Sequence, residues 1–199
     1  NNKKKQSSTP SVNFDNTKIL DLGCGGGLIC EPLARLGANV TGIDFVKENI
    51  LVATKHAKSS SLKINYLHQD VENLKLRKKY DIILIFELLE HLENWKNLII
   101  TISKYLSKDG IVVISTINRN LLSKALAIFM AENILKWVPK NTHEYSKLIK
   151  PEELTSFLNN NKFKVIDNTG LMYNPLLFQW QLNKNRNKVN YFCCAKKTN

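Results

Sequence analysis

A glycine-rich segment most constrains the fold of this chain. Four glycines stand within five residues, at Gly23, Gly25, Gly26 and Gly27, directly after an apolar run that ends at Leu22. Glycine tolerates the left-handed backbone and the close approaches that a tight turn around a ligand requires. A strand that passes through such a turn into a helix is typical of open α/β sheets that bind a ligand at the carboxyl ends of their strands.

The spacing of these glycines separates two classes of ligand. Dinucleotide-binding turns carry G-x-G-x-x-G, and the third glycine of that motif would fall at residue 28, which is Leu28. The segment instead reads D-x-G-x-G from Asp21. A carboxylate here repels a pyrophosphate and attracts the ammonium and sulfonium charges of S-adenosylmethionine. We therefore predict an S-adenosylmethionine site with contacts from Asp21, Gly23 and Gly25.

The rest of the chain alternates short apolar runs with helical stretches, the pattern of a parallel sheet covered by helices on both faces. The predicted strands are 18–22, 39–43, 63–67, 81–86, 111–115, 163–167 and 190–195. The predicted helices are 28–36, 47–59, 95–107 and 151–158, with Gly110 as a left-handed cap after the third. We expect 1–17 to be a tail or a truncated N-terminal segment, 18–199 to be one domain, and about 119–149 to be a helical insertion after the fifth strand.

Residues 121–138 of this insertion are largely apolar, so a membrane span is the first alternative to consider. Lys124, Glu132 and Lys136 interrupt the run, and its polar residues lie on opposite sides of a helical wheel. Two short helices that meet near Ala131 are therefore predicted. They could cover a pocket, lie on a membrane surface or only pack against the fold.

Two further carboxylates follow predicted strands. Asp44 ends the second strand, 21 positions after Gly23, where a carboxylate can accept both ribose hydroxyls. Asp70 follows the third strand, where it can face an adenine edge. A helix cap or a turn residue is the alternative for both. Because the carboxyl ends of parallel strands meet at one edge of a sheet, we expect both beside the glycine segment.

The segment after the fourth strand contains a candidate metal site. If the chain turns helical after Phe86, Glu87, Glu90 and His91 stand at i, i+3 and i+4 on one helix face. Two carboxylates and an imidazole could bind Mg²⁺ or Mn²⁺ and lower the pKa of a bound phenol. The alternative is a capped helix with one surface histidine.

The formal net charge of +12 has two explanations. The chain contains 25 Lys but 4 Arg, together with 24 Asn, which is typical of an AT-rich coding sequence and a solvated surface. A footprint for phosphates or a membrane is the alternative. The four cysteines form no C-x-x-C pair and no cluster at zinc spacing, so a reducing compartment is expected.

Seven segments together resemble the ubiquinone-biosynthesis O-methyltransferases, which methylate polyprenylated catechol and demethylubiquinol intermediates. They read I-L-D-L-G-C-G-G-G, V-T-G-I-D, E-L-L-E-H, S-T-I-N-R-N, A-E-N-I-L-K-W-V-P-K-N-T-H-E, I-K-P-E-E-L and T-G-L-M-Y-N-P. The resemblance runs from about Lys18 to Ala195. It implies a Rossmann-like class I methyltransferase with a mostly parallel, seven-stranded sheet.

The resemblance also implies roles for individual residues. It gives cofactor contacts at Gly23, Asp44 and Phe86, and metal ligands at Glu87, Glu90 and His91. His143 lies in a family motif and could act as a general base or orient the substrate, although a plain surface histidine is the alternative. Because S-adenosylmethionine is already activated, the protein must align the reactants and deprotonate the phenol. We therefore predict His143, Glu90 and His91 as the catalytic residues.

The resemblance implies a polyprenylated phenol or quinol substrate, a peripheral membrane contact by the insertion and a place in a ubiquinone-biosynthesis complex. The expected location is the cytoplasmic face of a bacterial inner membrane or the matrix side of the mitochondrial inner membrane. Nucleic acid is not expected, because F-E-L-L stands where amino-methylating enzymes of nucleic acids carry N/D-P-P-Y/F. One alternative is a methyltransferase of another small molecule. Another is a catalytically incomplete S-adenosylmethionine-binding module, since 1–17 do not show the family's pattern of aromatic residues with a cofactor-contacting Arg.

Overall fold

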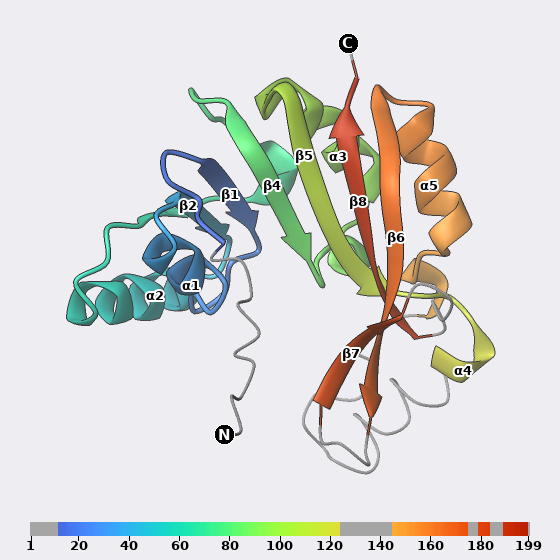
Figure 1. Ribbon diagram of the computed structural model, residues 1–199, viewed down its shortest axis with the longest axis horizontal. Coiled ribbons are helices and arrows are strands. Elements are labelled where there is room, and N and C mark those ends of the chain that lie inside the picture. The colour runs from blue at the N-terminus through green and yellow to red at the C-terminus, as the bar shows by residue number, and fades with distance from the viewer. Residues whose placement is uncertain (1–11, 124–144, 175–178, 184–188, 199) are drawn as a thin grey trace, which may run out of the picture.

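The computed structural model describes residues 12–123, 145–174, 179–183 and 189–198. Within them, eight strands form one sheet in the order β3-β2-β1-β4-β5-β8-β6-β7 (Figure 1). The strands are β1 (Lys18–Leu22), β2 (Asn39–Asp44), β3 (Asn65–His68), β4 (Tyr80–Phe86), β5 (Leu106–Ile117), β6 (Phe163–Asn174), β7 (Gln179–Asn183) and β8 (Asn190–Lys197). The helices are α1 (Cys30–Arg35), α2 (Lys47–Ser59), α3 (Trp95–Tyr105), α4 (Leu121–Ser123) and α5 (Pro151–Asn159).

The sheet has a parallel half and an antiparallel half. Strands β3, β2, β1, β4 and β5 pair in parallel, whereas β8, β6 and β7 join β5 through antiparallel pairings. The predicted Rossmann-like α/β class is confirmed. The predicted count of seven strands differs from the eight that the described residues form, because β7 is an additional strand. Its sequence, Q-W-Q-L-N, contains no apolar run that would mark it.

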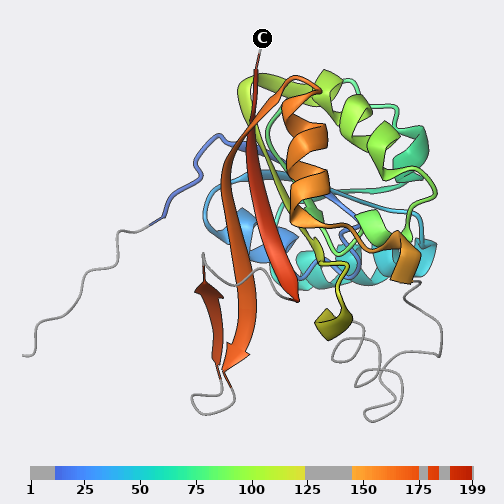
Figure 2. The same cartoon turned by 90° about the vertical axis from the view of Figure 1, so that its right-hand side faces the viewer.

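Helices cover both faces of the sheet, as predicted. Side chains alternate along each strand, so Leu20 and Ile83 join one buried cluster while Ile19 and Leu84 join the other. The first cluster includes residues of α3 and α5, which cover the same face in Figure 2. The second includes residues of α1 and α2. The apolar runs of β1 and β4 are therefore buried on both faces, as central strands of a parallel sheet are.

Two helix ends differ from the prediction. Helix α1 begins at Cys30 rather than residue 28, and α3 ends at Tyr105, after which β5 begins at once. Gly110 does not cap α3, so that prediction is wrong. Instead Asp109 takes the positive φ, at 64°, and a Cβ on Gly110 would lie 3.0 Å from the side chain of Leu106.

Most of the predicted insertion lies outside the described residues, including the two helices expected near Ala131. Its described ends are α4 and a 3-10 turn, Tyr145–Lys147. Among the residues that the structure describes, no helix has the length and apolar character needed to cross a membrane.

Candidate functional site

The glycine segment forms a tight turn that is tied to β2. Gly23, Gly25 and Gly27 have φ angles of 75°, 52° and 86°, which only glycine adopts without strain. The N–H of Gly23 donates to Ile43 O at 2.8 Å, and the N–H of Gly25 donates to Asp44 Oδ2 at 2.9 Å. These amides therefore fix the turn against β2.

The space around Gly25 is open. A Cβ built on this residue would meet no atom within 4 Å, whereas a Cβ on Gly23 would lie 3.2 Å from the side chain of Leu88. Since Gly25 also donates to Asp44, the open space lies beside a carboxylate. This combination of a glycine turn, free volume and a carboxylate fits the ribose and amino-acid parts of S-adenosylmethionine.

Asp21, one residue before the end of β1, is a buried acid, only 3% exposed, and accepts a hydrogen bond from the Cys30 thiol at 3.2 Å. Burial raises the pKa of Asp21 to about 6; the Cys30 thiol lowers it and the nearby charge of Asp44 raises it further. Its carboxylate gains from a neighbouring positive charge, since such a charge offsets the cost of ionising a buried acid. The contact of Asp21 with a cationic ligand stays a prediction.

Asp44 is held from three directions. Its Oδ1 accepts the N–H of Val46 at 2.8 Å and the side-chain amide of Asn49 at 3.3 Å, while Oδ2 accepts the N–H of Gly25. Parallel pairing of β1 with β2 brings Asp44 next to Asp21, as the sequence predicted. Asn49 was missed, although its position in the first turn of α2, five residues after Asp44, is a signal for such a contact.

Asp70 is exposed and caps a 3-10 turn, Val71–Asn73. Its Oδ1 accepts the N–H of Glu72 at 2.9 Å and its Oδ2 accepts the side-chain amide of Asn73 at 2.7 Å. The structure therefore shows the capping role, and an adenine contact stays a prediction.

Phe45, which directly follows Asp44 and is 70% exposed, is an aromatic side chain at this edge that the sequence analysis did not single out.

Phe86 lies at the carboxyl end of β4, as predicted. Its ring packs edge-on against Phe192 of β8, with ring centroids 5.6 Å apart. The central strands therefore present Asp21, Asp44 and Phe86 at one edge of the sheet, where open α/β sheets bind their ligands.

The predicted helix after Phe86 does not form. Glu87 takes a positive φ of 48°, and only Leu89–His91 make a 3-10 turn. The Ser115 hydroxyl donates to Glu87 Oε1 at 2.7 Å, and the Thr116 hydroxyl donates to Glu90 Oε2 at 2.8 Å. The premise that Glu87, Glu90 and His91 share one helix face is therefore wrong.

Glu90 is 4% exposed, and its Oε1 has no hydrogen-bond partner within the described part of the chain. Burial, and then the charge of Glu87, raise the pKa of Glu90 to about 7. The two carboxyl groups are therefore close neighbours.

His91, by contrast, is exposed, and the described residues hold no group of three or more His, Cys, Asp or Glu arranged for a metal ion. The three side chains do not form a ready metal site. His143 lies outside the described residues.

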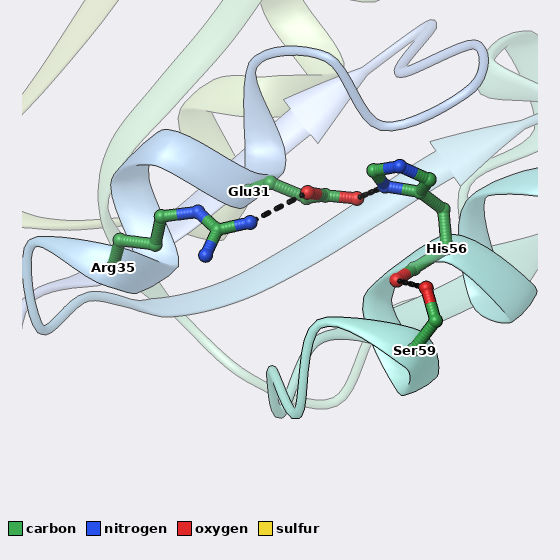
Figure 3. A network of polar contacts seen from close by, with 4 residues as sticks. All are labelled: Glu31, Arg35, His56 and Ser59. Atoms are coloured by element: carbon green, nitrogen blue, oxygen red, sulfur yellow. Dashed lines mark hydrogen bonds and ion pairs between the residues drawn. The ribbon is translucent and has the colours of Figure 1, made fainter.

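A polar network joins α1 to α2 beside the glycine segment (Figure 3). Glu31 lies between Arg35, at 3.2 Å, and the Nδ1 of His56, and the His56 ring is the main cause that lowers the pKa of Glu31. The network borders a groove of about 480 Å³ whose surface is mainly apolar. The residues lining it are Gly26, Gly27, Leu28, Glu31, Pro32, Arg35, Val52 and His56. Neither Glu90 nor His91, the predicted catalytic residues within the described part of the chain, lines it.

Curated relatives resemble this chain over nearly its whole length. It is 45% identical over 184 residues to the ubiquinone biosynthesis O-methyltransferase of Rickettsia conorii, covering 92% of this chain and 63% of that protein. It is 46% identical over 186 residues to the protein of the same name from Bartonella tribocorum, covering 93% and 75%. The chain thus spans about two thirds to three quarters of the length of these relatives.

Solved structures with low sequence identity share the fold. Magnesium protoporphyrin IX methyltransferase from Synechocystis, solved with bound SAH, superposes with a TM-score of 0.69 at 20% identity, over 94% of this chain and 76% of that one. A SAM-dependent methyltransferase from Methanosarcina mazei gives 0.69 at 20% identity, over 92% and 93%. The fold is therefore that of class I methyltransferases.

Residues 3–168 also match the family model described as a methyltransferase domain. On this match and the identity to its relatives, the chain belongs to the ubiquinone biosynthesis O-methyltransferases, within the methyltransferase-domain family.

Proposed function

We propose that this chain transfers a methyl group from S-adenosylmethionine to a catechol-type hydroxyl of a polyprenylated ubiquinone precursor. The observation that carries the cofactor half is the open space at Gly25, next to the buried carboxyl group of Asp44. The substrate half rests on the relatives, whose name gives ubiquinone biosynthesis and O-methylation.

The cofactor would be held by complementary charge and hydrogen bonds. Asp44 would accept the ribose hydroxyls while Gly25, Val46 and Asn49 keep its carboxylate in place. Asp21 would face the cationic amino-acid end, where a positive charge favours its ionised form. Bound S-adenosylmethionine supplies a methyl group that is already activated, so the protein need not activate it further.

The substrate hydroxyl would lie at Glu90. Its buried Oε1 has no partner in the described part of the chain, so it can accept the proton of a phenol that points to it. The carboxyl ends of β4 and β5 place this atom at the same edge of the sheet as Phe86. His143 is proposed as a second proton acceptor or as a group that orients the substrate.

The tail of the substrate implies where the protein works. A polyprenylated phenol resides in a bilayer, so we propose a peripheral contact with the membrane through 121–138. The side of the membrane would be the cytoplasmic face in a bacterium or the matrix side in a mitochondrion. A shared complex with other ubiquinone-biosynthesis enzymes would pass such a substrate along without its release.

The test is methyl transfer from labelled S-adenosylmethionine to catechols with short isoprenoid tails. We expect product with the wild-type chain and at least about tenfold less with Asp44→Ala at low cofactor concentration, because this variant loses the ribose contact. Transfer to tailless catechols at equal efficiency would favour a methyltransferase of another small molecule. Calorimetric binding of S-adenosylmethionine without turnover on any catechol would instead favour a catalytically incomplete binding module.

Metal binding by Glu87, Glu90 and His91 stays a prediction, and the reaction as proposed needs no metal step. Titration of Mg²⁺ into wild type, Glu90→Gln and His91→Ala, followed by calorimetry, tests it directly. Heat of binding that disappears in both variants would support the site. Activity that resists a chelator, with no heat in the wild type, would exclude it.

A further inference from the structure

Two neighbouring hydroxyls at the carboxyl end of β5 hold the two carboxyl groups that follow β4. Ser115 Oγ donates to Glu87 Oε1 at 2.7 Å, and Thr116 Oγ1 donates to Glu90 Oε2 at 2.8 Å. A further bond, from the Glu87 N–H to Ser115 O at 3.0 Å, joins the backbones at this point. These contacts connect positions 28 and 26 residues apart in the sequence.

The backbone of this segment does not fix the carboxyl groups by itself. Glu87 has a left-handed backbone, and Glu90 belongs to a turn of three residues. Adjacent residues of a strand point to opposite faces, yet Ser115 and Thr116 each reach a carboxyl group. This is possible because Glu87 and Glu90 lie beyond the end of β4, one exposed and the other buried.

Stability alone does not account for this arrangement. Thr116 is fully buried and Ser115 is 6% exposed, between the buried apolar residues Ile114 and Ile117. Apolar side chains of similar size would fill the same space without burying a carboxyl group, which is costly. The arrangement also leaves Glu90 Oε1 buried without a partner in the described part of the chain. Thus one oxygen of Glu90 is held by Thr116, and the other is buried with no hydrogen-bond partner among the described residues.

We propose that Ser115 and Thr116 are positioning residues, which hold Glu87 and Glu90 so that the unpartnered oxygen of Glu90 is directed to the substrate hydroxyl when the substrate binds. This inference rests on the proposed function and adds two residues to it. Because both hydroxyls are bonded to the carboxyl groups, they would act by restricting the rotation of these groups rather than by contacting the reactants. Alignment of a reacting group within a fraction of an ångström strongly affects the rate of a transfer reaction.

The test compares Thr116→Val, which keeps the shape but loses the hydroxyl, with Thr116→Ser, which keeps the hydroxyl. We expect Thr116→Val to lower kcat on a short-tailed catechol about tenfold or more and to leave the Kd for S-adenosylmethionine unchanged. Thr116→Ser should retain kcat within about twofold. Ser115→Ala should lower kcat in the same sense, because Glu87 would lose its donor.

A matched control is available on β6. Thr169 is 5% exposed and its hydroxyl donates to Asp167 Oδ2 at 2.7 Å, so Thr169→Val removes the same kind of bond away from Glu90. This variant should retain kcat. A folded Thr116→Val chain with wild-type kcat would overturn the inference. So would a Thr116→Ser chain as impaired as Thr116→Val, or a Thr169→Val chain with the same loss.

A second measurement separates this inference from the proposed function. If the wild-type chain methylates no catechol, the proposed function fails, and unfolding in urea then decides the inference. The double variant combines Thr116→Val with Glu90→Leu. If its urea midpoint shifts by less than the summed shifts of the two single variants, a bond between Thr116 and Glu90 is supported. Midpoint shifts that simply add overturn it.

Discussion

Gly27→Ala tests the turn at which we propose that the cofactor binds. Gly27 has a φ of 86°, and a Cβ built there would lie 2.3 Å from Tyr66 Oη and 3.3 Å from the Cβ of Ala53. A left-handed backbone costs a residue with a Cβ about 1–2 kcal/mol. Crowding in a packed interior adds about 1–3 kcal/mol. We therefore expect the free energy of unfolding to fall by about 2–5 kcal/mol.

Two further variants divide this loss into its parts. Gly25→Ala carries the same kind of backbone penalty, at φ 52°, but its Cβ would meet nothing within 4 Å, so it should cost about 1–2 kcal/mol. Tyr66→Phe removes the obstructing oxygen. Since that hydroxyl is buried and makes no hydrogen bond of ordinary geometry in the described residues, Tyr66→Phe alone should change stability little.

Urea unfolding of the three single variants and of the double variant Gly27→Ala with Tyr66→Phe measures these differences. Tyr66→Phe should lower the loss of unfolding free energy caused by Gly27→Ala by about 1–2 kcal/mol, which is most of the part due to crowding. The relief should be incomplete, because Tyr66 Cζ would still lie 3.1 Å from the new Cβ. If Gly27→Ala costs no more than Gly25→Ala, or if Tyr66→Phe gives no relief, the close packing of the turn against Tyr66 is refuted.

Three other predictions concern buried polar groups. Because its folded pKa of about 6 exceeds the usual value, Asp21 contributes stability below about pH 4 and loses it as the pH rises towards 6. Asp21→Asn should thus gain on the order of 2–3 kcal/mol relative to wild type between pH 4 and 7 in urea unfolding. In the wild-type chain, the affinity for S-adenosylmethionine measured by calorimetry should rise with pH, and in Asp21→Asn it should not. The same pH dependence in both proteins would contradict this role of Asp21. Asp44→Ala should raise the Kd for S-adenosylmethionine at least about tenfold. Asn49→Ala, which removes only a long hydrogen bond, should raise it about twofold. Equal increases in Kd would contradict the role of Asp44 as the ribose contact. Tyr191→Phe should destabilise the chain by about 1–2 kcal/mol, because the carbonyl of Ile149 loses its buried partner at 3.1 Å, and an unchanged urea midpoint would show that water replaces it.

The central strands were predictable because their burial on both faces leaves continuous apolar runs. β1, β2 and β4 were placed within one residue of their observed bounds. β5 was predicted too short, since its first residues, Leu106–Gly110, include polar side chains that still extend the strand. β7 was missed because pairing with β6 defines it rather than an apolar pattern.

The positions of candidate residues were predictable where strand ends determine them. Asp21 and Asp44 lie near the carboxyl ends of the paired strands β1 and β2, as predicted, and their cofactor contacts stay predictions. The expectation that Glu87 lies on a helix face was wrong. Its positive φ could not be predicted, because glutamate is not a residue type that favours this backbone conformation. Ser115 and Thr116 were missed because their bonds to Glu87 and Glu90 connect distant segments. Two hydroxyls at the end of an otherwise apolar strand are the signal that could have found them.

The position of β8 has a consequence for how the chain is made. β8 lies between β5 and β6, so a growing chain cannot complete the sheet until residues up to Lys197 have left the ribosome. Until then the part of β5 that β8 will pair with, Ile111–Ile117, is an open edge, and such edges pair readily with other chains. β6 can meanwhile pair only with β7, as a separate hairpin. Losses of protein to aggregation during synthesis should therefore arise at this edge, before the last eight-residue strand closes it.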